Sequence, residues 1–294
     1  MFDKQKFSEW YDQNYKILLI IPLILVIASI AFIVSFYVKT GDIMNKDVSL
    51  KGGTSITING NVDVSVLEKN LPSYFPDVGF RKLTEVTTGE QVAVIIETSA
   101  GPDEIKSKIT ELRVILTDEN SSIEFTGPSL SANFYKQLMF ALFLSFVLMS
   151  CVIFILFRSF IPSIAVIFAA LSDIIIPLAI LDFLNIQISS AGIAAFLMLI
   201  GYSVDTDILL TTRALKKKEG SLNHRIFGAF STGILMTGTA LAAVLPAFFL
   251  ISGLPDSFRQ IFLILAMGLV TDIISTWMTN ASIIKWYCHS KNIK

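Results

Sequence analysis

Four aspartates stand inside long apolar runs of this sequence, where an ionisable side chain is unusual. Asp173 and Asp272 fall near the middle of their runs, and Asp205 and Asp207 lie two residues apart in GYSVDTDILLTTR, residues 201–213. Acids in a membrane interior are costly, so they indicate a function by default. The interiors of these runs contain no lysine or arginine, and a buried carboxyl group without a cation is expected to be protonated part of the time. We therefore predict that the four acids take part in proton coupling, whereas Asp182, at the outer end of its run, is expected to be solvated.

Asp205 and Asp207 cannot share one face of a helix, because residues two apart point about 200° away from each other. Both faces are small or polar, with Ala191, Ala194, Gly201 and Thr212 beside Asp205, and Ser189, Gly192, Ser203 and Thr211 beside Asp207. Such a helix packs closely against neighbours on two sides. The fourth segment is therefore predicted to be a central helix with two packed neighbours. The alternative is that the acids only hydrogen-bond serine, threonine or backbone groups and hold helices together.

Six apolar segments are long enough to cross a hydrocarbon core, which takes roughly 20 residues. The chain of 294 residues is 53% hydrophobic and 16% charged. Its mean hydropathy is +0.67. The first segment is longer than the apolar core of a signal peptide, so we interpret it as a retained anchor. The segments are Ile17–Val38, Leu138–Phe157, Ser163–Phe183, Ile188–Thr212, Ile226–Ile251 and Phe258–Trp286.

The orientation of these segments follows from the basic residues at their ends. Lysine and arginine gather at alternate ends, which predicts that both termini are cytoplasmic. These residues are Lys4, Lys6, Lys16, Arg158, Arg213, Lys216, Lys217, Lys218, Arg225, Lys285, Lys291 and Lys294. The predicted organisation is a cytoplasmic N-terminus with the first helix (1–38), an external domain (39–136), helices two to six (137–287) and a cytoplasmic tail (288–294).

The external stretch alternates strand and helix patterns in the order βαββαβ, which is typical of a ferredoxin-like domain. The fold class is therefore an α-helical polytopic membrane protein with one small α+β external domain. The predicted elements are strands at Val48–Ile58, Gly79–Thr87, Gln91–Thr98 and Ser122–Thr126, helices at Val64–Phe75 and Pro102–Leu116, and a hairpin turn at Thr88-Gly89-Glu90.

Several function classes find no support in the residues. A net charge of -1 does not favour nucleic-acid binding. Cys151 and Cys288 are far apart in different surroundings, so no disulfide framework is expected. His224 and His289 have no acid or cysteine at ligand spacing, and both are predicted to be cytoplasmic, so we expect no metal site and no Ser-His-Asp hydrolase. Gly52-Gly53 is not followed by a nucleotide-binding pattern. We therefore expect neither an enzyme nor a bound cofactor.

Two stretches resemble motifs of one family. The fourth segment looks like the fourth-helix motif of the SecD/SecF protein-export family. Asp47-Val-Ser-Leu-Lys-Gly-Gly-Thr54 resembles the Asp-x-x-Gly-Gly element that opens the external domain of that family. Six helices with one soluble domain between the first two match it along the whole chain, and the short external domain resembles the SecF branch of archaeal type. The motif residues are Gly201, Tyr202, Ser203, Asp205, Arg213, Asp47, Gly52 and Gly53.

The resemblance implies an RND-like fold in which a six-helix chain is half of a pseudo-symmetric unit. It implies SecD, a SecY-type channel and a translocating polypeptide as partners, with export drawing on the proton gradient in bacterial members. Asp205 matches the acid of the SecD motif, whereas Asp207 replaces an amide, so the resemblance favours Asp205 for proton coupling and a structural role for Arg213. The competing hypotheses are half of an RND-like proton-driven exporter of small molecules or lipids, and a membrane scaffold. The short external domain leaves little room for a small-molecule tunnel.

Overall fold

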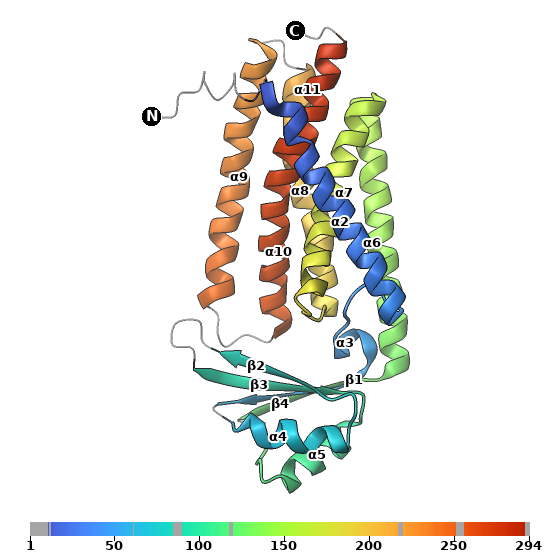
Figure 1. The fold of residues 1–294 in the computed structure, drawn as a ribbon, viewed down its shortest axis with the longest axis vertical. Helices are drawn as coiled ribbons and strands as arrows, with labels where there is room; N and C mark the ends of the chain where they lie inside the picture. The colour runs from blue at the N-terminus through green and yellow to red at the C-terminus, as the bar shows by residue number, and fades with distance from the viewer. Residues whose placement is uncertain are drawn as a thin grey trace.

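Long apolar helices form the body of the protein, and a small antiparallel sheet lies across one end of them (Figure 1). This computed structural model describes residues 11, 13–60, 62–84, 90–117, 120–216, 220–250 and 256–291. Within these residues six helices are long and apolar enough to cross a membrane, which confirms the six predicted segments. Their spans are Gln13–Thr40, Pro128–Phe157, Phe160–Phe183, Ser190–Lys216, Leu222–Phe249 and Phe258–Ser290.

The six spans differ in how they are built. The first contains α2 (Ile20–Thr40), and the next four are α6 (Pro128–Phe157), α7 (Phe160–Phe183), α8 (Ser190–Lys216) and α9 (Leu222–Leu250). The last joins α10 (Asp256–Ile274) to α11 (Ala281–Ser290) through a π-helical segment, Ser275–Asn280. The sequence pattern predicts one continuous helix here and does not reveal the π-helical turn.

The interior of the bundle is formed by α7, α8 and the last span. In the most apolar part of α7 and of α8, 56% of the residues are buried, against 11% in the first, second and fifth spans. Leu181, Ile193, Leu199 and Ile264 pack together in one of the buried clusters. The prediction that the fourth segment is a central helix is confirmed, because α8 packs against α6, α7, α9 and α10, although its Asp205 side is exposed in this chain.

The sheet belongs to a ferredoxin-like domain. Its strands are β1 (Gly53–Asn59), β2 (Gly79–Thr84), β3 (Gln91–Thr98) and β4 (Ser121–Thr126), arranged antiparallel in the order β2-β3-β1-β4. The helices α4 (Val64–Asn70) and α5 (Pro102–Glu111) cover the face that points away from the membrane helices (Figure 1). Apolar residues at alternate strand positions pack against them, including Ile56, Ile58 and Ile96. The predicted βαββαβ order is confirmed.

Several predicted elements are wrong in their bounds. Val48–Lys51 is a short helix, α3, because Asp47 caps its first turn and Gly52 ends it with a φ of 87°. The helix α5 ends at Glu111, and Arg113 follows in the left-handed region at a φ of 65°. The helix α6 begins ten residues before Leu138, at Pro128, with proline at its first position. The predicted hairpin turn lies almost wholly outside the described residues, as do residues 85–87 of the second strand.

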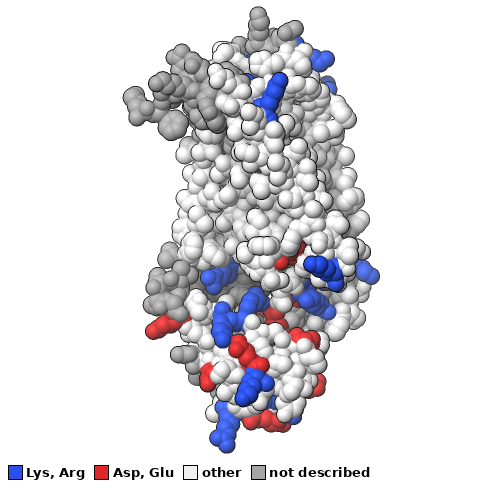
Figure 2. Space-filling view, in the orientation of Figure 1, with Lys and Arg blue, Asp and Glu red and all other residues white. Residues whose placement is uncertain are grey.

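Charge is distributed unevenly along the molecule. Figure 2 shows a broad band of the helical body without charged side chains on this face, and acidic and basic side chains gathered over the sheet and its junction with the helices. A band of this kind is what a hydrocarbon environment requires. Cys151 and Cys288 are both free thiols, which confirms the absence of a disulfide between them.

Candidate functional site

Three of the four predicted acids come together inside the helical body. Asp173 lies on α7, Asp207 on α8 and Asp272 on α10, and their side chains are 0%, 0% and 1% exposed. Each helix is held in place by its own apolar contacts, so the three carboxyl groups have fixed positions. Buried polar groups need hydrogen-bond partners, and here hydroxyl and amide side chains supply them.

Asp173 is held by two serines from different helices. Ser203 of α8 donates to Oδ2 of Asp173, and Ser275 of the π-helical segment donates to Oδ1 at 2.5 Å. Ser203 belongs to the family-like motif, and its buried position gives that motif residue a structural contact with an acid. Asp173 therefore ties α7 to both α8 and the last span.

Asp272 lies within hydrogen-bond distance of three threonine hydroxyl groups. Thr206 of α8 lies 3.0 Å from Oδ1 and 3.2 Å from Oδ2, and Thr237 of α9 lies 3.3 Å from Oδ2. Thr276, one turn beyond Asp272, lies 3.0 Å from Oδ1. The carboxyl group of Asp272 is thus surrounded by hydroxyl groups from three helices.

Asp207 is joined to the same network by the π-helical segment. Thr276 lies 3.0 Å from Oδ1 of Asp207, and the side-chain amide of Asn280 donates to the same oxygen at 2.7 Å. The other oxygen, Oδ2, is buried and has no hydrogen-bond partner in the described part of the chain. Asp207 and Asp272 therefore share one hydroxyl group, that of Thr276.

The π-helical segment places these partners. In an α-helix, successive residues turn by about 100°, so positions four apart drift around the axis. A π-helix closes i→i+5 hydrogen bonds in a wider turn, and the Ala281 amide bonds the Thr276 carbonyl in this way. Within and beside this turn, Thr276 and Asn280 both reach Asp207, while Thr276 also reaches Asp272. Such turns occur frequently at functional sites.

No lysine or arginine neutralises the three acids among the ion pairs of the described residues. Arg213, the basic residue that ends the motif, donates instead to the Gly228 carbonyl at 2.6 Å and fastens α8 to α9. This contact accounts for a structural role of Arg213 without involving the carboxyl groups.

Asp205 is not part of the network. Its side chain is exposed on the outside of this chain, next to Gly201 and to Tyr202, which is 53% exposed. The prediction that the two acids of α8 face opposite sides is confirmed: Asp207 faces this chain's own helices, and Asp205 faces outward. An exposed acid at this depth of a membrane helix is costly, so a further surface is needed to cover it.

The Asp47–Gly53 element forms the junction between the sheet and the helices. Oδ1 of Asp47 accepts from the Ser49 amide at 2.8 Å and from the Ser49 hydroxyl at 2.6 Å. Burial raises the pKa of the Asp47 carboxyl group, and the bonds from Ser49 oppose that shift. Gly52 and Gly53 have φ values of 87° and 132°, and a Cβ at either position would overlap backbone atoms, at Pro128 for the first and Thr98 for the second. Both glycines are therefore required sterically.

Hydrogen bonds join this junction to the segment that connects α7 and α8. The Asp47 amide donates to the Ile188 carbonyl at 3.1 Å, and the Ile188 amide donates to the Asn45 carbonyl at 2.6 Å. The Asn45 amide donates to Oδ1 of Asp182 at 2.8 Å. The expectation of a solvated Asp182 is wrong: its residue is 2% exposed, because the chain leading to the sheet covers it.

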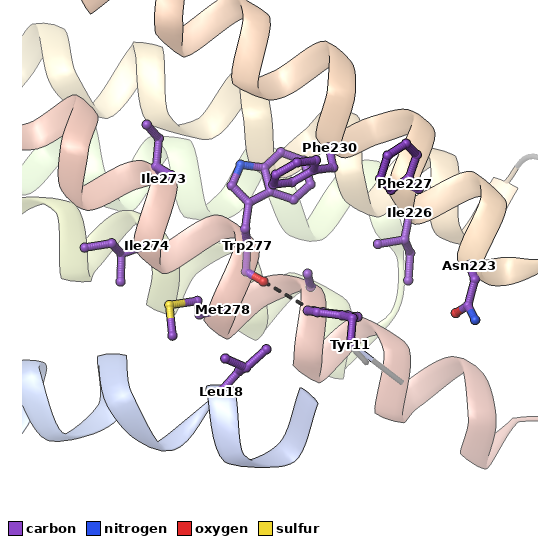
Figure 3. Close-up of a pocket in the computed structure, with 11 residues that line it drawn as sticks. Tyr11, Leu18, Asn223, Ile226, Phe227, Phe230, Ile273, Ile274, Trp277 and Met278 are labelled. Atoms are coloured by element: carbon purple, nitrogen blue, oxygen red, sulfur yellow. Dashed lines mark hydrogen bonds between the residues drawn. The ribbon is translucent and has the colours of Figure 1, made fainter. Parts of the chain in front are cut away.

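An apolar groove of about 240 Å³ lies beside the π-helical segment (Figure 3). Trp277 packs edge to face on Phe230 with ring centroids 5.1 Å apart. The Tyr11 hydroxyl donates to the Trp277 carbonyl oxygen at 3.2 Å, as the dashed line in Figure 3 marks. Tyr11 thus satisfies a carbonyl group of the irregular turn, and burial raises the pKa of its phenol to about 12.

The partners of the acids are the residues that the sequence reasoning missed. They are Ser275, Thr276 and Asn280 of the last span, with Thr206 and Thr237. The spacing of Asp272, Thr276 and Asn280, four residues apart in an apolar run, is the signal that points to them.

The fold and the site define a class of polytopic membrane proteins, in which a ferredoxin-like domain is inserted between the first two of six helices and buried acids meet inside the bundle. Residues 105–290 match a family model described as protein export membrane protein SecD/SecF, C-terminal. Curated relatives are the protein-export membrane proteins SecF of Methanolacinia petrolearia and Methanocaldococcus jannaschii, 38% and 35% identical, each over 94% of this chain and 96% of the relative. That of Pyrococcus furiosus is 34% identical over 97% of this chain and 95% of the relative. The chain belongs to the SecD/SecF family.

Solved structures share the fold of this chain. SecDF of Thermus thermophilus, a translocon-associated membrane protein, superposes with a TM-score of 0.74 at 17% identity. The match covers 94% of this chain and 38% of that one. A second SecDF structure, in the super-membrane-facing form, gives a TM-score of 0.54 at 19% identity over 96% of this chain and 39% of that one. The chain therefore spans under two-fifths of the SecDF chains that it matches.

Proposed function

We propose that this chain is an auxiliary subunit of the Sec protein-export machinery, which acts with SecD to promote the movement of a polypeptide through a SecY-type channel. The proposed energy source is proton movement through the membrane interior. One observation carries this proposal: Asp173, Asp207 and Asp272, from three helices, meet in a single buried network of hydroxyl and amide groups. Membership of a protein-export family supplies the task that the proton movement would serve.

The exposed Asp205 supports a partner of the same architecture. On this chain alone its carboxyl group faces the hydrocarbon, where an aspartate costs about 2.5–3.5 kcal/mol. Gly201 lies one turn before it and is also exposed, which leaves room for the close approach of a second helix. The match to less than two-fifths of SecDF agrees with a second six-helix half, and SecD is the proposed occupant of this face.

The proposed orientation places both termini in the cytoplasm and the ferredoxin-like domain on the other side. Arg158, Arg213 and Lys216 stand at the ends of α6 and α8 that are remote from the sheet. The positive-inside rule assigns that side to the cytoplasm. The sheet is then positioned to meet a polypeptide as it leaves the channel.

The experiment that tests the proposal replaces Asp173, Asp207 and Asp272 singly by asparagine and follows export of a secreted reporter. Each variant is compared with and without an ionophore that collapses the proton gradient. Asp103→Asn, at an exposed acid of α5, is the matched control. We expect the gradient-dependent part of export to disappear in the three variants and to persist in the control. Unchanged export in all three, with the protein still folded in the membrane, contradicts the proposal.

The competing exporter of small molecules or lipids is separated by co-purification. The proposed subunit is recovered from native membranes with SecD and the channel. Recovery without either of them, and with a bound small molecule or lipid, favours the exporter.

A further inference from the structure

We propose that Thr276 is a proton relay between Asp207 and Asp272. The proposal rests on the proposed proton coupling and deepens it, because it names the group through which a proton passes between the two acids. Its basis is the position of one hydroxyl group, 3.0 Å from Oδ1 of Asp207 and 3.0 Å from Oδ1 of Asp272.

The single hydroxyl hydrogen of Thr276 limits the hydrogen bonds that this side chain can donate. A threonine hydroxyl has one hydrogen to donate and lone pairs with which to accept. It can donate to one carboxyl group only, so the second short contact is a hydrogen bond only if that carboxyl group carries a proton and donates to Thr276. The geometry therefore corresponds to one proton held by the Asp207–Asp272 pair, with Thr276 between its two possible positions.

The contacts of Asp272 with Thr206 are limited in the same way by the number of hydrogens available to donate. The hydroxyl of Thr206 lies 2.8 Å from the Ser203 carbonyl oxygen and 3.0 Å from Oδ1 of Asp272, and it also has only one hydrogen to donate. Thr237 is the single contribution of α9 to this carboxyl group, at 3.3 Å. A protonated Asp272 can donate to Thr206, whereas an ionised one cannot.

The remaining groups around the pair set the charge balance. The helix α7 contributes one acid, Asp173, which is occupied by two serines, and the described ion pairs place no cation on the pair. Asn280 donates to Asp207, so it stabilises that carboxyl group when it is ionised. One proton on the pair, with one carboxylate left to accept from Asn280 or from the threonines, satisfies these contacts.

The proposed step moves one proton from acid to acid in two coupled transfers. The O–H bond of protonated Asp207 breaks and its proton forms a new O–H bond with Oγ1 of Thr276. At the same time the original O–H bond of Thr276 breaks, and that proton forms an O–H bond with Oδ1 of Asp272. Asp207 ends as a carboxylate, Asp272 as a carboxylic acid, and Thr276 as the neutral hydroxyl with which it began.

The π-helical segment provides a matched pair of residues for the test. Thr276 and Thr279 belong to the same irregular turn, and both are buried. The hydroxyl of Thr279 has no hydrogen-bond partner in the described part of the chain. Replacing either threonine by valine removes a hydroxyl and keeps the shape, but only Thr276→Val interrupts the proposed relay.

Proton uptake is measured in liposomes that contain the full chain together with SecD, under an imposed pH gradient. Because a positioned proton-transfer group contributes about 10²–10⁴-fold, we expect Thr276→Val to slow uptake by at least about 10²-fold. Thr276→Ser, which keeps a hydroxyl, should retain most of the wild-type rate, and Thr279→Val should leave it unchanged. Asp207→Asn and Asp272→Asn serve as the test of the underlying proposed function.

The outcomes separate the relay from the proposed function. Wild-type uptake by Thr276→Val, with uptake lost in the two asparagine variants, overturns the relay and leaves proton coupling in place. Unchanged uptake in the asparagine variants contradicts proton coupling itself.

Infrared spectra of the full chain provide a second readout that does not depend on transport. The carboxylic-acid C=O band of the pair, identified as the band that both asparagine variants alter, should shift in Thr276→Val and stay unchanged in Thr279→Val. A band that Thr276→Val leaves in place overturns the relay, whatever that variant does to transport.

Discussion

Replacing each acid of α8 by leucine should have opposite effects on the isolated chain. Asp205 faces outward and has no hydrogen bond or ion pair among the described residues, whereas Asp207 is fully buried and bonded to Thr276 and Asn280. Asp205→Leu removes a carboxyl group from the outer surface of the helix. Asp207→Leu removes the carboxyl group to which Thr276 and Asn280 are hydrogen-bonded. The same substitution, two residues apart, therefore distinguishes the two faces of one helix.

The magnitudes follow from these environments. At the centre of a membrane helix aspartate costs about 2.5–3.5 kcal/mol and leucine contributes about -0.3 to -0.6 kcal/mol, so Asp205→Leu should stabilise the isolated chain by up to about 3–4 kcal/mol. Asp207→Leu leaves the amide of Asn280 without its carboxylate acceptor. An orphaned buried donor costs about 1–3 kcal/mol, so this variant should be less stable than the wild type by at least that amount.

The assay has two arms. Unfolding of the purified chain in mixed micelles by increasing dodecyl sulfate gives the two stability changes, with Asp205→Asn and Asp207→Asn as polar controls. Recovery of SecD with tagged chain gives the effect on pairing, which Asp205→Leu should weaken because the partner then meets an apolar side chain. A chain destabilised by Asp205→Leu as strongly as by Asp207→Leu would refute the assignment of the two faces.

Three further predictions concern the junction and the π-helical turn. Gly53→Ala should cost about 2–6 kcal/mol in thermal unfolding, because positive-φ strain and overlap with the Thr98 carbonyl add together. Gly60→Ala has open space at a φ of 101° and should cost only about 1–3 kcal/mol, so equal losses contradict the argument. Asp47→Ala should lose about 1 kcal/mol as a helix cap and Asp47→Asn less. Because burial raises the pKa of Asp47, the protonated side chain contributes to the free energy of unfolding at low pH, and this contribution falls as pH rises through the folded pKa. Unfolding measured against pH should show this dependence in the wild type and not in Asp47→Asn. Burial raises the pKa of Tyr11 from 10.0 to about 12. Tyr11 should therefore contribute fully to the free energy of unfolding below pH 10, and this contribution should fall by up to about 2.7 kcal/mol toward pH 12. The fall should be absent from Tyr11→Phe in the same titration.

Much of the fold was predictable because it depends on long, strong patterns. An apolar run of some 20 residues leaves the chain few alternatives in a membrane, and the run of β-forming residues at Gln91–Thr98 predicts β3 with its observed bounds. The error at Val48–Lys51 has a local cause. Its residues suit a strand, but Asp47 satisfies the amide of Ser49 and Gly52 breaks the run, so one helical turn is more stable there.

The candidate site was predictable in its acids and not in its partners. Asp173, Asp207 and Asp272 are conspicuous because each is a carboxyl group in an apolar run. The irregular turn after Ile274 has no such signal, since its residues suit an ordinary helix equally well. It is supported by tertiary contacts, among them the Tyr11 bond to the Trp277 carbonyl, and Tyr11 lies more than 260 residues away in the sequence. A pattern read along one segment cannot show a contact of this kind.

The helix α8 connects the buried acids to the sheet, a connection that the proposed coupling of proton movement to the external domain requires. It is a continuous helix of 27 residues. Asp207 lies 17 residues after Ser190, a separation of about 26 Å along a helix that rises 1.5 Å per residue. At its first turn the Ser190 amide donates to the Ser49 hydroxyl at 3.0 Å, and Ser49 is bonded to Asp47, which caps the short helix α3 before the two positive-φ glycines. A rigid helix transmits displacement along its axis, and the backbone packs closely around the two glycines of the junction. A shift of α8 at Asp207 must therefore move the sheet or break the hydrogen bonds of Ser49.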